Sequence, residues 1–187
     1  MMVLGMSAQA FSAPLPEEVG QVGQVVVGGT GCADATITRI SNGRIRVETD
    51  KLAAEVGGDS GRSMDLKSCT IAIPVQVNAG YQVANADLTL SGRVRLAEGS
   101  AADARVESFF AGARGPVKVR EYTGATRRRT IITTNYPDDQ KIWSACGQDV
   151  ILRVNTRIKA ELGTATDAGS LALERATVAP IEWRRCE

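Results

Sequence analysis

The sequence predicts an all-β fold, an antiparallel β-sandwich of roughly eight to ten strands with little helix and two disulfides. Apolar residues recur at every second position in several segments, which is typical of strands with one buried face. Glycine and asparagine residues that favour turns separate these segments. Four cysteines lie far apart in the chain of 187 residues, a length that suits one domain with a substantial core.

Three segments show the period-two pattern most clearly, namely residues 69–77, 87–97 and 146–162. The first segment turns Cys69 toward the core, where a disulfide can join two parts of the sandwich. In the second segment, Arg93 and Arg95 are expected to face solvent between buried apolar positions. The inward residues expected in the second and third segments are Leu88, Leu90, Gly92, Val94, Leu96, Val150, Leu152, Val154 and Ile158.

Weaker β signals complete the set of strands. Asn42 and Gly43 lie between two short β-prone runs and supply the positive φ angles of a type I′ turn, so a hairpin is predicted within residues 37–47. Pro74 predicts an edge position or a bulge, because proline cannot donate to a ladder. Residues 100–103 are predicted to form a loop. The remaining strands are predicted at residues 106–110, 117–122, 130–134 and 176–183.

The N-terminus has the features of an export signal. Its first residues are uncharged and largely apolar, contain an Ala8-Gln9-Ala10 cleavage pattern and precede Pro14, although an ordinary N-terminal tail is the alternative. The predicted division of the chain is a signal-peptide remnant at 1–13, an N-terminal extension at 14–28 and one secreted β-sandwich domain at 29–187. No segment has the roughly 18 consecutive apolar residues of a transmembrane helix. The expected location is therefore secreted, periplasmic or in the cell envelope.

In such a compartment the cysteines are expected to pair as disulfides. The chain has no C-x-x-C pair, so neither a zinc knuckle nor a thioredoxin-like site fits. Four cysteines allow three connectivities; Cys32–Cys69 with Cys146–Cys186 is favoured because each bond closes one half of the chain. Four buried free thiols in a cytosolic protein are the alternative.

Four short motifs follow one another along the chain: Gly29-Thr30-Gly31-Cys32, Lys67-Ser68-Cys69-Thr70-Ile71, Trp143-Ser144-Ala145-Cys146-Gly147 and Ile181-Glu182-Trp183-Arg184-Arg185-Cys186. In this order they resemble the secreted four-cysteine family known as domain of unknown function 4360, which occurs in fungi and bacteria. Residues 78–83 resemble the family too, whereas Ala145 departs from it, since many members have proline there. The resemblance implies a secreted, all-β, disulfide-bonded domain, and it implies no activity, substrate or catalytic residue.

The composition excludes several function classes. The chain has no histidine, which excludes Ser-His-Asp and Cys-His catalysis, histidine-bound zinc and a histidine-based pH switch. Gly58-Asp59-Ser60-Gly61 matches the loop around a protease's nucleophilic serine, but without histidine it is predicted to be a turn. A Ser-Lys dyad with Lys51 or Lys67 is the remaining catalytic alternative there. No cofactor is expected.

Asp138 and Asp139 are the best candidates for metal or acid chemistry. Adjacent carboxylates can supply oxygen ligands to calcium, or an acid and a base to a glycosidase. Calcium takes about six to eight oxygens, however, and only these two carboxylates lie together in the sequence. They are therefore expected to be turn residues that follow Pro137, and no metal site is predicted.

Residues 113–130 are the clearest anomaly in charge. They contain six basic residues and one acidic residue, a net charge of +5 in a chain whose total is +1, so the remainder carries −4. If residues 117–122 and 130–134 form a hairpin, the arginine triplet lies near its tip. Clustered guanidinium groups suit polyanions, whereas the alternative is a solvated loop that protects edge strands. The candidate anion-binding residues are Arg114, Lys118, Arg120, Arg127, Arg128 and Arg129.

These observations support two main hypotheses about function. The leading one is a non-enzymatic secreted or envelope domain that binds a polyanionic surface or polysaccharide through the Arg-rich segment. Specific nucleic-acid binding is not expected, because the net charge is close to zero. The alternative is an extracellular glycan hydrolase that uses Asp and Glu pairs; an adhesive coat component is a third. Trp143 and Trp183 are expected to pack against the disulfides rather than stack on carbohydrate.

Overall fold

The computed structural model describes residues 19–187 and has the all-β antiparallel fold that the sequence predicts. The described part contains fourteen strands, more than the eight to ten expected. The difference arises because several strands have only three or four residues, too few to display an alternating pattern. The predicted signal-peptide remnant at 1–13 lies outside the described residues. The loops include three 3-10 turns: η1 (Ser41–Gly43), η2 (Gly58–Ser60) and η3 (Asp138–Gln140).

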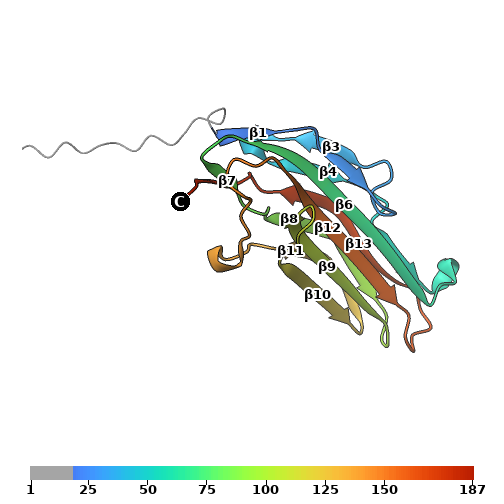
Figure 1. Ribbon diagram of the computed structural model, residues 1–187. Helices are drawn as coiled ribbons and strands as arrows, with labels where there is room; N and C mark the ends of the chain where they lie inside the picture. The colour runs from blue at the N-terminus through green and yellow to red at the C-terminus, as the bar shows by residue number, and fades with distance from the viewer. Residues whose placement is uncertain (1–18) are drawn as a thin grey trace, which may run out of the picture.

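Two six-stranded sheets stack face to face, as Figure 1 shows. Sheet A contains β1 (Gly20–Val22), β2 (Val26–Gly28), β6 (Met64–Val77), β9 (Ala101–Phe110), β10 (Val117–Thr123) and β12 (Val150–Glu161). Sheet B contains β3 (Thr36–Arg39), β4 (Ile45–Glu48), β5 (Ala53–Val56), β8 (Leu88–Leu96), β11 (Thr126–Thr133) and β13 (Gly169–Val178). A third, two-stranded sheet pairs β7 (Tyr81–Val83) with β14 (Trp183–Arg185) at the end where the C-terminus lies (Figure 1).

The strand order places β10 and β11, which are edge strands of the two sheets, on one side of the sandwich. Sheet A runs β1-β6-β12-β9-β10 and sheet B runs β11-β8-β13-β4-β3. Because residues 124–125 alone connect β10 to β11, the chain crosses from the edge of one sheet directly to the edge of the other. β10 and β11 therefore each pair with only one neighbouring strand, and their unpaired edges lie next to each other.

The hydrophobic core lies between the two sheets. Most of the side chains predicted to face inward are buried in it: Leu88, Leu90, Val94 and Leu96 of β8, and Leu152, Val154 and Ile158 of β12. Removing such side chains from water stabilises the fold by about 1.5–3 kcal/mol each. The opposite faces of these strands are polar and point away from the core, which leaves each sheet one outer face for contact with other molecules.

The predicted hairpin within residues 37–47 is confirmed. β3 pairs with β4, with Arg39 opposite Ile45, and Asn42 and Gly43 have φ angles of 65° and 70°. The loop is longer than a two-residue type I′ turn, because five residues separate the paired ends and include η1. The Asn-Gly pair therefore predicts correctly that the chain reverses direction here. It does not predict the length of the loop, which depends on where the β3–β4 ladder ends.

Pro74 lies at a break in the neighbouring strand, in agreement with the predicted bulge. β1 and β2 both pair with β6. Residues 23–25, which connect β1 to β2, are not part of either ladder, and this interruption lies opposite Pro74. The carbonyl of Pro74 accepts a hydrogen bond of 2.8 Å from the Gly23 amide, and no amide on that side is needed from the proline.

Several boundaries differ from the predicted ones. β1 and β2 belong to sheet A, so residues 20–28, assigned to an N-terminal extension, form part of the sandwich. The prediction that residues 100–103 form a loop is wrong, since β9 begins at Ala101 and pairs with both β10 and β12. Alanine has a low strand propensity, and only pairing on both sides makes this segment extended.

Both disulfides have the predicted connectivity. Cys32 and Cys69 join the β2–β3 crossover to β6 with a Cα–Cα distance of 5.2 Å, and both cysteines are buried. Cys146 and Cys186 join the loop before β12 to the C-terminus with a Cα–Cα distance of 5.8 Å. Among the described residues, no helix has the length and apolar character to cross a membrane.

Candidate anion-binding face

The Arg-rich segment does not form the predicted hairpin. β10 pairs with β9 in sheet A, and β11 pairs with β8 in sheet B, so the two strands belong to opposite sheets. The arginine triplet is not at a tip but inside β11, which begins at Thr126 rather than Thr130. Consecutive side chains of a strand point to opposite faces, so the triplet is divided between two environments.

The outer face of sheet B gathers four arginines. In the β11–β8 ladder, Arg127 lies directly opposite Arg95, and Arg129 lies directly opposite Arg93. All four side chains are exposed. We refer to Arg93, Arg95, Arg127 and Arg129 as the four-arginine patch. The alternating pattern predicts that Arg93 and Arg95 lie on an outer face, but it cannot show that they adjoin the Arg-rich segment, because the register of β11 on β8 is a tertiary feature.

The four-arginine patch is electrostatically unfavourable in the free protein. Directly opposed like charges destabilise an antiparallel pair; two unit charges about 6 Å apart in water repel by about 0.7 kcal/mol. Only Arg93 has an acidic partner, Glu174, whose Oε1 lies 2.8 Å away. Within residues 19–187 no ion pair joins Arg95, Arg127 or Arg129 to a carboxylate. A bound anion would relieve this repulsion.

A groove runs along β13 beside the patch. Its floor contains the small side chains of Ser170 and Ala172, which lie opposite Arg95 and Arg93 in the β13–β8 ladder. Three hollows of about 280, 320 and 440 Å³ lie on this face, and the latter two share Glu48 and Glu174 in their linings. We refer to this feature as the β13 groove. At Ser170 and Ala172 the middle strand carries short side chains, whereas Arg95, Arg93 and Glu55 on the neighbouring strands carry long ones.

The wall of the groove opposite the patch is acidic. Glu55 on β5 lies beside Ser170, and Glu48 on β4 lies beside Arg175. The Glu48 carboxylate accepts a hydrogen bond of 2.8 Å from Arg175 Nε, and Arg175 Nη2 lies 2.7 Å from it. These ion pairs are about half exposed, so each contributes little to stability. The groove therefore has one basic wall and one acidic wall.

The other members of the Arg-rich segment lie around Tyr122 at the sandwich edge. The guanidinium groups of Arg120 and Arg128 are each 5.9 Å from the centre of the Tyr122 ring, one from each sheet. Tyr122 is buried, and its hydroxyl is hydrogen-bonded to Thr130 Oγ1. Arg120 and Arg128 thus cover a structural tyrosine.

Two of the six predicted anion-binding residues, Lys118 and Arg114, belong neither to the four-arginine patch nor to the arginines around Tyr122. Lys118 is exposed on β10, two positions before Arg120, and Arg114 is exposed in the loop between β9 and β10. The structure therefore brings only Arg127 and Arg129, of the six predicted residues, into the four-arginine patch.

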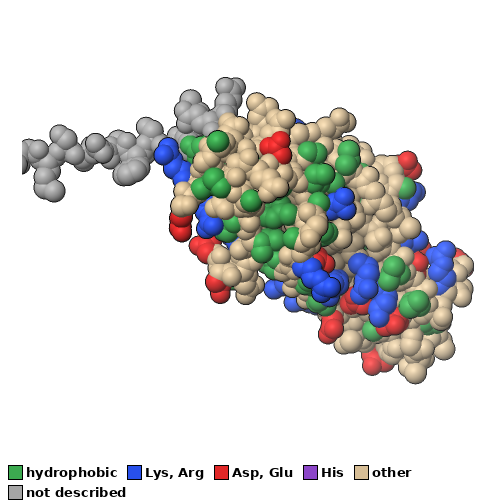
Figure 2. Space-filling view, viewed as in Figure 1, with side chains coloured by type: hydrophobic (Ala, Val, Ile, Leu, Met, Phe, Trp, Pro, Cys, Tyr) green, Lys and Arg blue, Asp and Glu red, His purple; other side chains and the backbone are tan. Residues whose placement is uncertain are grey.

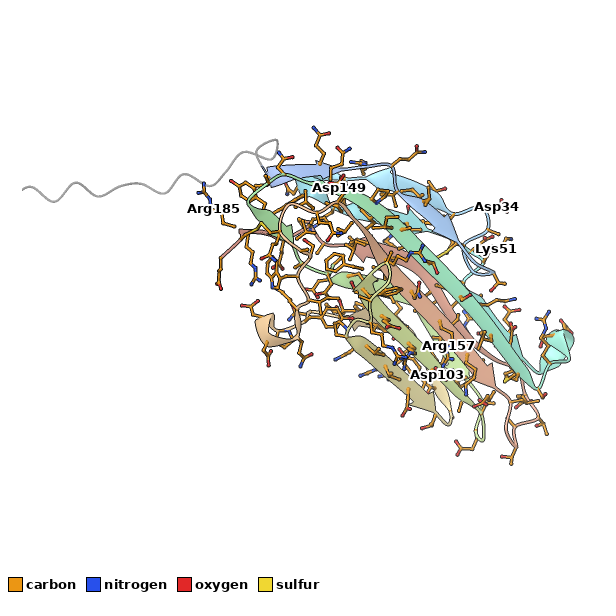
Figure 3. The ribbon with its side chains drawn as sticks, viewed as in Figure 1. Asp34, Lys51, Asp103, Asp149, Arg157 and Arg185 are labelled. Atoms are coloured by element: carbon orange, nitrogen blue, oxygen red, sulfur yellow. A yellow bond between two sulfur atoms is a disulfide. The ribbon has the colours of Figure 1, made fainter. Side chains whose placement is uncertain are left out.

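The outer face of sheet A provides a contrast. Its basic residues are interleaved with an equal number of acidic ones: Arg105, Arg153, Arg157 and Lys159 against Asp103, Glu107, Glu121 and Glu161. Asp103 lies between Arg157 and Lys159, at 3.9 and 3.6 Å, and Figure 3 labels Asp103 and Arg157 side by side. In Figure 2 acidic side chains lie among the basic ones over β9 and β10. This face is charged but balanced.

The alternative catalytic and metal candidates have structural roles. Residues 57–61 form the predicted turn around η2, in which Ser60 Oγ donates a hydrogen bond of 2.6 Å to the Gly57 carbonyl. The two lysines proposed for a dyad pair with Asp50 and Asp65 instead. No group of three or more potential metal ligands is present among the described residues.

Asp138 begins the short turn η3, as expected for a residue after proline, and Lys141 connects it to the C-terminal segment. Lys141 Nζ lies 2.9 Å from the Asp138 carboxylate and 2.7 Å from that of Glu182. Hydrogen bonds to Glu182 and then to Asp138 hold the pKa of Lys141 well above its usual range. The ammonium group therefore occupies the position that a cation would need beside Asp138.

The tryptophans lie near the small third sheet and are half-buried. The Trp183 ring packs against Gly20, whose missing side chain leaves the space that the ring occupies. Arg184 lies over the Trp143 ring, 4.1 Å from its centre, in a cation–π contact. The rings of Trp143 and Trp183 therefore each make contacts within the protein.

Comparisons with known proteins place the chain in a family. It is 23% identical over 187 residues to an uncharacterized secreted protein of Arthroderma benhamiae, covering 94% of this chain and 75% of the relative. Among solved structures, a TmCBM61 complex with β-1,4-galactotriose aligns with 92% of this chain and 97% of its own, at 11% identity and a TM-score of 0.27. The VP2 subviral particle of infectious bursal disease virus aligns with 82% of this chain and 38% of its own chain, at 12% identity and a TM-score of 0.35.

TM-scores this low establish no common ligand. The family comparison is more direct, since one family model matches residues 20–186, from the first strand of sheet A to the last cysteine. The secreted relative and the two disulfides agree with the predicted exported location. Because the match covers the whole sandwich, this chain belongs to the family described as domain of unknown function (DUF4360).

Proposed function

We propose that this protein is an exported, non-enzymatic domain that binds an anionic polymer on the outer face of sheet B. The observation that carries the proposal is the pair of directly opposed arginines, Arg127 with Arg95 and Arg129 with Arg93. Guanidinium groups bind carboxylate, sulfate or phosphate oxygens through paired hydrogen bonds. Positions two apart on a strand are separated by about 7 Å, so the patch meets charges repeated along an extended chain.

Protection of an edge strand does not account for the patch. Charged residues on β11 alone would discourage pairing with another chain, because β11 is the edge of sheet B. Arg93 and Arg95, however, lie on β8, which is paired on both sides. Their placement opposite two further arginines adds repulsion without protecting any edge.

An enzymatic role has less support. A glycan hydrolase needs two carboxylates, one of them protonated, facing each other across its substrate. In the β13 groove the carboxylates of Glu48 and Glu174 are each held in an ion pair, with Arg175 and Arg93. We therefore propose binding rather than catalysis for this face.

The test compares the double variant Arg127→Ser/Arg129→Ser with Arg153→Ser/Arg157→Ser, which makes the same change in charge on the outer face of sheet A. Binding to immobilised heparin, poly-glutamate and polygalacturonate is measured against salt concentration. We expect the first variant to lose about tenfold or more in affinity for at least one polymer, because two charge-assisted contacts are removed. We also expect the slope of log affinity against log salt to fall by about one unit per lost contact.

The control variant is expected to bind like the unchanged protein, and thermal unfolding shows whether both variants remain folded. Equal weakening by the two variants would mean that only net charge matters. Binding that is unaffected by the loss of Arg127 and Arg129, or no binding by the unchanged protein, would overturn the proposal.

A further inference from the structure

The outer face of sheet B is ordered in rows that cross the strands. One row contains Arg127, Arg95, Ser170 and Glu55, taken from β11, β8, β13 and β5 in turn. A second row, two residues along, contains Arg129, Arg93, Ala172 and Ala53. A third contains Ile131, Ser91, Arg175 and Glu48, from β11, β8, β13 and β4. A ligand lying in the β13 groove therefore meets arginines on the β11–β8 side in the first two rows, and a glutamate on the β5–β4 side in the first and third rows.

Two glutamates of the groove, Glu48 on the acidic wall and Glu174 on β13, keep part of their capacity to accept hydrogen bonds. Glu48 pairs with Arg175 and Glu174 pairs with Arg93, yet both carboxylates keep about 40–47% of their side-chain surface exposed. Each carboxylate has roughly four lone-pair positions, and the bound arginine uses only part of them. The remaining positions accept hydrogen bonds from neutral donors such as hydroxyl groups, while a second anion placed there would be repelled.

An apolar contact completes the surface beside the four-arginine patch. Ile131 is 69% exposed and lines the same hollow as Arg129, Ser91 and Glu174. An exposed isoleucine on an otherwise polar strand face is a favourable contact for the C–H face of a sugar ring, which is apolar. Ser91 in the same hollow adds a hydroxyl group that can both donate and accept.

Resting on the function proposed above, we infer that the ligand is a uronate glycan, a polysaccharide with one carboxylate and several free hydroxyls per ring. Its carboxylates would lie against Arg127, Arg129 and Arg95, and its hydroxyls would reach Glu48 and Glu174. A heavily sulfated glycan or a phosphodiester polymer fits less well, because its dense charge would bring anions against the acidic wall. The two-sided groove thus selects for a polymer that is acidic on one edge and neutral on the other.

The experiment measures binding of polygalacturonate, its fully methyl-esterified form and heparin at one salt concentration. Methyl esterification keeps the rings and hydroxyls but removes the carboxylate charge. We expect the unchanged protein to prefer polygalacturonate over both by about tenfold or more, since one misplaced or missing charge contact costs about this factor. Arg127→Ser/Arg129→Ser is expected to lose polygalacturonate binding.

The contribution of the groove carboxylates is tested with Glu48→Gln/Glu174→Gln. We expect this variant to bind heparin more tightly and to lose most of the preference for polygalacturonate, because the repulsion that excludes dense anions is gone. The matched control is Glu121→Gln/Glu161→Gln on the outer face of sheet A, which is expected to keep the preference. Thermal unfolding of all variants shows that the fold is retained.

The outcomes separate this inference from the proposed function. If heparin binds as tightly as polygalacturonate and the glutamine variants change nothing, uronate selectivity is wrong while the anion-binding face stands. If the methyl ester binds as well as the free acid, the carboxylate contact is wrong. If Arg127 and Arg129 matter for none of the polymers, the proposed function fails as well.

Discussion

At the scale of single residues, Gly92 allows the outer face of sheet B to have its shape. A Cβ placed on Gly92 would lie 1.9 Å from the carbonyl oxygen of Ala172 and 2.8 Å from the Cα of Leu173, both backbone atoms of β13. The β8–β13 register shifts between Leu173 and Arg175, immediately beside this contact. The close approach therefore accompanies the bulge that brings Glu174 onto the face, where it meets Arg93.

Gly92→Ala is accordingly expected to destabilise the protein by about 1–3 kcal/mol, since the added methyl group must displace the backbone of β13. Gly28→Ala is the matched control, because Gly28 also lies in a strand, has no positive φ and has no atom within 4 Å of the added Cβ. Chemical denaturation of the two variants gives the comparison. A Gly92→Ala protein as stable as the control would show that β8 and β13 can separate locally at no cost.

At the scale of elements, the two disulfides differ in how far their cysteines are exposed to solvent. Cys32 and Cys69 are only 3% and 4% exposed and belong to the hydrophobic core. Cys146 is exposed and Cys186 half-buried, and their bond ties the last strand, β14, to the loop before β12. The third sheet has only one three-residue ladder, so this surface disulfide contributes much of what keeps it in place.

Mild reduction is therefore expected to cleave Cys146–Cys186 before Cys32–Cys69, because thiol–disulfide exchange requires access of the attacking thiolate to a sulfur atom. Timed alkylation followed by peptide mass measurement identifies which cysteines become free. The sandwich is expected to persist in the partly reduced protein, with a single remaining unfolding transition. Simultaneous release of all four thiols would mean that the two disulfides open only through global unfolding.

At the scale of the whole molecule, the sandwich is open on the side where β10 and β11 form adjacent edges. β10 is exposed along its length except at Tyr122, and its residues Val117 and Val119 are 38% and 46% exposed. Lys118 and Arg120 alternate with these valines. An edge strand with exposed valines pairs readily with other chains, and the interposed charges oppose this association.

Lys118→Val/Arg120→Val is therefore expected to self-associate at concentrations where the unchanged protein does not. Arg153→Val/Arg157→Val is the control, since it makes the same chemical change on β12, which is paired on both sides. Light scattering against protein concentration measures the difference. Equal association of both variants would point to general surface hydrophobicity instead of the free edge of β10.

A strand can be predicted from the sequence when its alternating pattern is long enough. β8 and β12 have nine and twelve residues, and their alternating apolar positions predict which side chains face inward. β7 and β14 have three residues each and owe their existence to one another and to a neighbouring disulfide. β11 shows the limit most clearly: its three consecutive arginines hide any alternation, so the sequence predicts a strand that begins only after them.

The sequence by itself determined the sandwich architecture, the inward faces of the long strands and the family membership, and its four cysteines favoured the pairing that the structure contains. These features follow from local periodicity and from motifs that can be read along the chain. The tertiary structure alone decided which arginines lie together. Arg93 and Arg129 are 36 positions apart, and only the register of β11 on β8 makes them neighbours. Register is set by how two sheets bury their inner faces at once, and that is a property of the packed whole.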